Sequence, residues 1–138
     1  MKIDYDYLKE VLSTFLTSDK PYITIRDLGF YEKNQEDLSK LIFHLTLLVD
    51  QGIIRDRELK YSSFEDITGI YFSGDGILHG GECDIVLTSE GHDFAMALSQ
   101  NPILERIKKD FSEAPMAAAK QIATKLFAKI LHDKLGLE

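Results

Sequence analysis

Apolar residues recur at helical spacing between Asn34 and Gln51, and this pattern predicts one long helix. If Gln51 is the C-cap, Gly52 occupies the next position, where a left-handed backbone favours glycine. Ile53 then falls where it contacts Leu48, three positions before the cap, as in a Schellman motif. The sequence therefore predicts both the helix and the way in which it ends.

Four shorter segments have the alternation or the β-branched residues that are typical of strands. They are, in chain order, 22–26, 53–54, 67–72 and 84–87. Residues 62–66 indicate a loop or a brief helical turn, and the glycines at 74, 76, 80 and 81 mark turns before the last strand. Only about eight residues separate the first strand from the long helix, so the helix that normally precedes a recognition helix is missing or a single turn.

Further helices are predicted at both ends of the chain. The first covers apolar residues from Leu8 to Leu16 and is capped by Asp4 or Asp6. After the last strand, the predicted helices run from a cap at Thr88 or Ser89 to Ser99, from Pro102 to about Phe111, and from near Ala114 and Pro115 to Leu135, where Gly136 stops the last one.

These elements predict an α+β fold: a winged-helix-like domain with a small three-stranded antiparallel sheet and a C-terminal helical extension. With 138 residues, of which 44% are hydrophobic, the chain is long enough for one core, so we expect a single domain. Within it, residues 1–100 form the winged-helix-like core. Residues 101–138 form C-terminal helices that either pack on the core or make a dimer seam.

The charge of the chain is −7 and is unevenly distributed. Residues 1–102 contain 9 Lys and Arg against 18 Asp and Glu, whereas residues 103–138 contain 7 against 5. Because DNA binding needs clustered positive charge, the acidic winged-helix region disfavours DNA as a partner. The absence of a long apolar run disfavours a membrane span, the N-terminus lacks a signal-peptide pattern, and the single Cys83 suits a reducing cytosol, so we expect a cytoplasmic protein.

Three segments appear in an order that resembles a known family. They are the opening Met1-Lys-Ile-Asp-Tyr-Asp6, the run from His44 to Ile54 and the run from Leu87 to Phe94, followed by a C-terminal helix that closes with Lys134-Leu-Gly-Leu137. The chain resembles the phage and prophage proteins of domain of unknown function 2513, akin to YjcQ-like winged-helix proteins. The resemblance implies the winged-helix fold and a bacterial or mobile-element origin, and it implies no activity or site residues.

The side of the long helix that faces away from its core stripe contains Lys40, Phe43 and Leu47. In a DNA-reading winged helix, this side enters the major groove with basic or amide side chains. Here the side contains two large apolar groups, Phe43 and Leu47, which predict that another surface covers it. Lys40, Phe43 and Leu47 are therefore the candidate interaction face. The cover is the protein's own C-terminal helices, a partner chain or, least favoured, DNA.

No catalytic residues are predicted, because the sequence has no nucleophile elbow, phosphate loop or paired acids in a recognisable spacing. A zinc site at His79, Glu82, Cys83 and Asp84 is disfavoured, because alternation along a strand sends neighbouring residues to opposite faces. We therefore expect no metal and no cofactor. His44 is expected at the edge of the core, partly buried, and the six tyrosines are expected to be half-buried packing residues.

The sequence thus predicts a non-enzymatic protein that acts through a protein partner or by self-association as a homodimer. The alternative is a DNA-binding transcriptional regulator that uses the winged helix.

Overall fold

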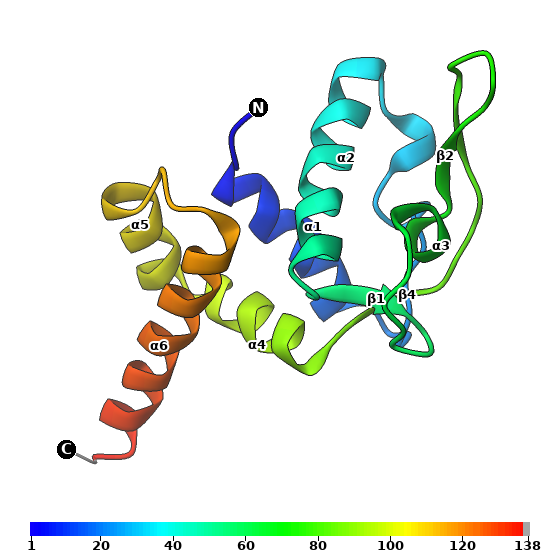
Figure 1. Ribbon diagram of the computed structural model, residues 1–138. Helices are drawn as coiled ribbons and strands as arrows, with labels where there is room; N and C mark the ends of the chain where they lie inside the picture. Colours follow the sequence, from blue (N-terminus) through cyan, green and yellow to red (C-terminus); the bar gives the residue numbers. More distant parts are fainter. Residues whose placement is uncertain (137–138) are drawn as a thin grey trace.

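The structure, a computed structural model, describes residues 1–136 and combines helices with two small antiparallel sheets (Figure 1). The helical elements are α1 (Tyr5–Thr17), the 3-10 turn η1 (Phe30–Glu32), α2 (Gln35–Asp50), α3 (Phe64–Thr68), α4 (Ser89–Leu98), α5 (Asn101–Asp110) and α6 (Met116–Lys134). The strands are β1 (Ile54–Asp56), β2 (Ile70–Phe72), β3 (Leu78–Gly80) and β4 (Ile85–Leu87). Leu137 and Glu138, at the end of the predicted C-terminal region, lie outside the described residues.

Three helices begin at side-chain caps, two of which the sequence predicts. The Asp4 carboxylate accepts a hydrogen bond from the Tyr7 amide at the start of α1, so Asp4 rather than Asp6 is the cap. The Asn34 side chain accepts from the amide of Asp37 at the start of α2. The Thr88 hydroxyl accepts from the amide of Gly91 at the start of α4. Each cap satisfies an amide that the first turn of the helix leaves without a partner.

The end of α2 is the predicted Schellman motif. Gly52 has a φ of +68°, and its amide donates to the carbonyl of Val49 over 3.1 Å. The amide of Ile53 donates to the carbonyl of Leu48 over 2.9 Å. These two hydrogen bonds close the helix and turn the chain directly into β1.

The predicted three-stranded sheet of residues 53–54, 67–72 and 84–87 is divided between two sheets. β1 pairs with β4 in antiparallel register, whereas β2 pairs with β3 in a sheet of its own. The predicted strand 22–26 contributes a single bridge to the first sheet, from Ile23 to Ile85. The chain turns away immediately afterwards, because the Asp27 carboxylate accepts a hydrogen bond from the Thr24 amide and Gly29 adopts a φ of +78°. β4 therefore lies between β1 and the Ile23 bridge.

The predicted strand 67–72 is shorter than expected, because its first two residues belong to α3. Ser63 caps α3 by accepting from the amide of Asp66, and Gly69, with a φ of +79°, ends it. β2 begins at Ile70 and pairs with β3 in a separate hairpin. The insertion between β1 and β4 thus contains a helical turn and a hairpin of its own.

The C-terminal helices follow the predicted boundaries within two residues. Pro102 lies in the first turn of α5, and Gly136 has a φ of +72° after α6. α4 and α5 pack on α1, and α6 packs on α4 and α5. Met116, Ala119 and Ala123 on the first half of α6 are buried in the same apolar cluster as the residues of α1 and α2.

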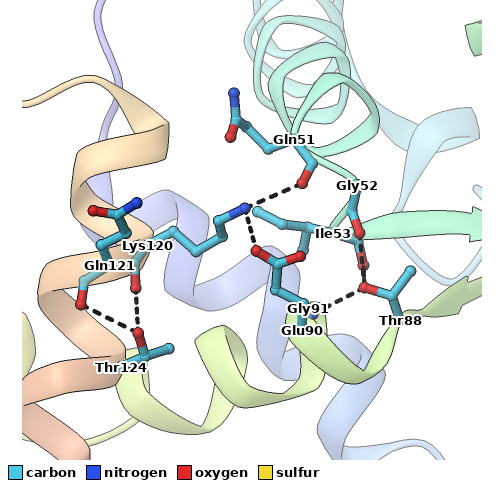
Figure 2. A network of polar contacts seen from close by, with 9 residues as sticks. All are labelled: Gln51, Gly52, Ile53, Thr88, Glu90, Gly91, Lys120, Gln121 and Thr124. Atoms are coloured by element: carbon cyan, nitrogen blue, oxygen red, sulfur yellow. Dashed lines mark hydrogen bonds and ion pairs between the residues drawn. The ribbon is translucent and has the colours of Figure 1, made fainter.

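A polar joint holds α4 against the end of α2 (Figure 2). The Thr88 hydroxyl donates to the carbonyl of Gly52 over 2.7 Å while it accepts from the amide of Gly91 over 2.9 Å. The Thr88 amide donates to the carbonyl of Ile53. A Cβ at Gly91 would lie 2.1 Å from that same carbonyl oxygen, so only glycine allows α4 to approach this closely.

Lys120 adds α6 to the joint (Figure 2). Its ammonium group donates to the carbonyl of Gln51, the C-cap of α2, over 3.3 Å and lies 2.5 Å from the Glu90 carboxylate. The side chain is only 14% exposed, whereas that of Glu90 is 60% exposed. A positive charge at the C-terminal end of a helix is favourable, since the helix dipole is negative there.

None of the helices within residues 1–136 is long and apolar enough to cross a lipid bilayer.

Candidate interaction surface

Lys40, the basic residue of the predicted interaction face, is bound within the molecule. Its ammonium group lies 2.8 Å from the Asp4 carboxylate and 4.7 Å from the centre of the Tyr7 ring. The hydrogen bond from Lys40 is the largest of the causes that lower the pKa of Asp4. Lys40 therefore fixes the start of α1 against α2 and is not a free cation for a ligand.

His44 lies beneath this ion pair and is fully buried, rather than partly buried as predicted. Its Nε2 accepts a hydrogen bond from the Asp4 amide over 3.0 Å, and its Nδ1 lies 2.8 Å from the carbonyl oxygen of Lys40. An amide only donates and a carbonyl only accepts, so the ring is neutral with its hydrogen on Nδ1. Burial lowers the pKa of His44 and so favours this neutral form. The ring is a structural member of the α1–α2 contact.

Phe43 and Leu47 are each half-buried. The Phe43 ring meets the His44 ring edge-on, with 5.1 Å between the ring centres, and Leu47 packs against the apolar core. The C-terminal helices, which the sequence favours as their cover, pack on α1 and on one another (Figure 1). That a second copy of the chain covers Phe43 and Leu47 stays a prediction.

A groove of about 430 Å³ lies beside α2, on a side that the sequence assigns to the core. Its walls are one face of α2 and the β2–β3 hairpin. They are formed by Gln35, Leu38, Ser39, Ile42, Phe72, Gly76, Ile77 and Leu78. Phe72 is 67% exposed and Ile77 57% exposed, so the groove presents large apolar side chains to solvent. Such apolar surface beside a concave wall is typical of a binding site.

The tip of the hairpin is held by its own turn. The Ser73 amide and the Ile77 carbonyl are hydrogen-bonded over 2.9 Å, and the Asp75 carboxylate accepts from the amide of Ile77 and from the Ser73 hydroxyl. These hydrogen bonds lower the pKa of Asp75, which therefore stays ionised. Gly76 has a φ of +81°, as the turn requires. Phe72 and Ile77, which flank the turn, are thus displayed on an ordered loop.

The base of the hairpin is locked to the body of the protein. A Cβ at Gly80 would lie 2.6 Å from side-chain atoms of Ile25 and Phe30, and the Tyr31 hydroxyl donates to the Gly80 carbonyl. The amide of Gly81 donates to the carbonyl of Gly69 over 2.7 Å. Since the base is fixed, the hairpin is a rigid wall of the groove.

The groove is lined by apolar and uncharged polar side chains. Glu36 and Asp37, exposed in the first turn of α2, line a different hollow together with Lys2, Asp4 and Lys40. The groove therefore favours a ligand that inserts apolar groups.

Three of the four residues of the disfavoured zinc set have other contacts. Glu82 pairs with Arg26, Asp84 pairs with Arg57, and the His79 ring stacks on Tyr71 at 5.2 Å. In the described part of the chain, no group of three or more His, Cys, Asp or Glu side chains has an arrangement that could hold a metal ion.

The tyrosines differ from the prediction. Tyr5 is buried and Tyr7 half-buried, but the other four are exposed. Three of these four lie under arginine guanidinium groups, in the pairs Arg26–Tyr31, Arg55–Tyr61 and Arg57–Tyr22. Arg57 and Tyr22 are 35 positions apart, so the proximity of this pair appears only in the fold.

Comparisons with protein-family models, with curated proteins and with solved structures found no match to this chain. The resemblance to domain of unknown function 2513 therefore rests on the sequence segments alone.

Proposed function

We propose that this chain is a winged-helix protein of the phage or prophage type, located in the bacterial cytosol, that acts by binding another protein and has no enzymatic activity. The order of α1, the Ile23 bridge, η1, α2, β1 and β4 supports the winged-helix part of the proposal. The central position of β4 between the bridge and β1 supports it as well. In this fold, α2 corresponds to the recognition helix.

The groove between α2 and the β2–β3 hairpin is the single observation on which the protein-binding proposal rests. Phe72 and Ile77 project from a braced hairpin toward Leu38 and Ile42 of the would-be recognition helix. A partner that inserts apolar side chains there removes this surface from water, which is the main source of binding free energy in such interfaces.

DNA is the weaker candidate for the same helix. Glu36, Asp37 and Asp50 are exposed along α2, and its one lysine is paired with Asp4. Phosphate groups are repelled by such a surface, and an unpaired basic cluster is what non-specific DNA affinity requires. The fold alone supports the DNA alternative.

A displayed library of random peptides tests the proposal directly. We expect selection to enrich peptides that contain two or more apolar residues, and we expect the double substitution Phe72→Ser and Ile77→Ser to weaken their binding at least tenfold. Leu59→Ser is the matched control, because Leu59 is 60% exposed but lies outside the groove. Fluorescence anisotropy with labelled peptides gives the affinities.

Fluorescence anisotropy also tests whether the protein binds DNA. Mixed-sequence duplexes at low salt should show no binding in the micromolar range. Micromolar duplex binding that weakens steeply with added salt would favour the transcriptional regulator, and peptide binding that survives the double substitution would remove the groove from the proposal.

A further inference from the structure

The second half of α6 presents an apolar surface beside α4. Leu131 is 48% exposed and Leu135 73% exposed, and Met96 on α4 is also exposed. Between the two helices lies a groove of about 330 Å³, formed by His92, Asp93, Met96, Thr124, Phe127, Ala128 and Leu131. Figure 1 shows the last turns of α6 extending away from the rest of the molecule. One continuous patch, which we call the α4–α6 patch, thus contains a recess and a projecting apolar turn.

The charges at the two ends of this patch are opposite. Asp93 is exposed at the α4 side of the groove, and Lys134 is exposed at the end of α6. Within residues 1–136, neither forms an ion pair. Glu90, one turn before Asp93 on α4, pairs with Lys120, and Lys134 is fourteen residues and hence about 21 Å of helix beyond Lys120. Asp93 and Lys134 of one chain therefore lie at opposite ends of the patch.

We propose that the α4–α6 patch binds a second copy of this chain in a symmetric dimer. If two α6 helices run antiparallel and cross near Ala128, the last turn of each lies beside Thr124 of the other. Leu135 then enters the partner's groove, and Lys134 meets Asp93 across the interface. The exposed Ala128 lets the helix backbones approach closely at the crossing.

Self-complementarity is the reason to favour a second copy as the occupant. A two-fold interface requires that the same patch supply both members of every contact. Here the recess and the projecting turn, and the acid and the base, lie on one patch at matching separations. The patch is on different elements from the α2–hairpin groove, so the inference does not depend on the proposed function.

Sedimentation velocity over a range of concentrations tests the dimer. The contact is limited to two helix turns and one groove, so we expect a dissociation constant on the order of micromolar. Leu135→Glu and Leu131→Glu should each weaken dimerisation at least tenfold without lowering the melting temperature measured at a dilution where the wild type is monomeric. Leu59→Glu is the control of similar exposure and should leave dimerisation unchanged.

A charge exchange tests the orientation of the two copies. Asp93→Lys and Lys134→Glu should each weaken the dimer, and the two together should restore it, because each interface regains an opposite pair. In a Cys83→Ser background, Ala128→Cys should form a disulfide between copies under mild oxidation. Ala117→Cys, exposed on the same helix but far from the crossing, should not. A wild type that sediments as a monomer up to several hundred micromolar overturns the proposal, and so does a dimer that both Leu substitutions leave intact.

Discussion

At the scale of single residues, His44 has the environment that most constrains its chemistry. Both ring nitrogens face backbone groups, one an amide and one a carbonyl, beneath the Lys40–Asp4 ion pair. Protonation would place a second hydrogen against the Asp4 amide and remove that hydrogen bond. The imidazole therefore stabilises the contact between α1 and α2 only in its neutral form.

This predicts a pH dependence of stability. The pKa of His44 in the folded protein lies below its ordinary value of 6.5, so the unfolded chain takes up a proton first as the pH falls. The contribution of His44 is complete above pH 6.5 and is lost as the pH falls from there through the folded pKa, with a slope of at most about 1.4 kcal/mol per pH unit. Urea unfolding between pH 7.5 and 5 should show this slope in the wild type and a flatter curve for His44→Leu. Equal slopes in the two proteins would contradict the assignment.

The contacts of His44 and Lys40 also show that the sequence does not predict which distant residue a side chain contacts. The sequence places both on α2 correctly, but their partner Asp4 lies 36 to 40 positions away. The same holds for Arg57 and Tyr22, which are 35 positions apart. A helical projection orders side chains around one axis and contains no information about which other element approaches it.

At the scale of elements, the most informative position is the N-cap of α4. One hydroxyl, that of Thr88, caps α4 and also binds the carbonyl of Gly52 at the end of α2. Removal of this hydroxyl leaves an amide and a carbonyl without a partner in a tightly packed place.

Thr88→Val, which keeps the side-chain shape, should therefore lower the free energy of unfolding by about 1–2 kcal/mol. Thr88→Ser retains the hydroxyl and should cost clearly less. Chemical denaturation of the three proteins at one pH measures the difference. If Thr88→Ser and Thr88→Val are equally destabilising, the lost methyl packing rather than the hydrogen bonds is responsible.

The elements that the sequence predicts well are those whose ends depend on local chemistry. Asn34 and Thr88 accept hydrogen bonds from amides three residues later, and Gly52 ends α2 through its left-handed backbone. Such local roles can be inferred from the sequence. The sheet is less predictable, because three-residue strands depend on distant partners. Ile23 pairs with Ile85, 62 positions later, while the nearby Asp27 carboxylate turns the rest of the predicted strand away. β3, by contrast, has a nearby partner in β2 but contains only Leu, His and Gly, with no β-branched residue to indicate a strand. The β2–β3 hairpin, and hence the groove beside it, were therefore missed.

At the scale of the whole molecule, Lys120 connects α6 to α2 and α4. It bonds the last carbonyl of α2 and the Glu90 carboxylate at the start of α4. Lys120 is largely buried, whereas Glu90 is mostly exposed. The carbonyl contact should therefore contribute more to stability than the ion pair, which water and salt screen.

A double-mutant cycle separates the two contacts. Lys120→Met should lower the free energy of unfolding by about 1–2 kcal/mol, because it leaves the Gln51 carbonyl without its donor, and Glu90→Gln should cost less than about 1 kcal/mol. The coupling between the two substitutions should shrink in high salt while the cost of Lys120→Met largely remains. A cost of Lys120→Met that disappears in high salt would assign the whole effect to the ion pair.

The joint at Lys120 also sets an order of events during synthesis of the chain. Gln51 and Lys120 are 69 positions apart. At about 5–20 residues per second, the ribosome makes the carbonyl roughly 3–14 s before it makes the ammonium group that binds it. Until then, water solvates the end of α2, and once α4 has been made, its apolar side stays exposed until α6 follows. A translational pause between the synthesis of α4 and that of α6 would prolong this exposure and so favour aggregation of the nascent chain.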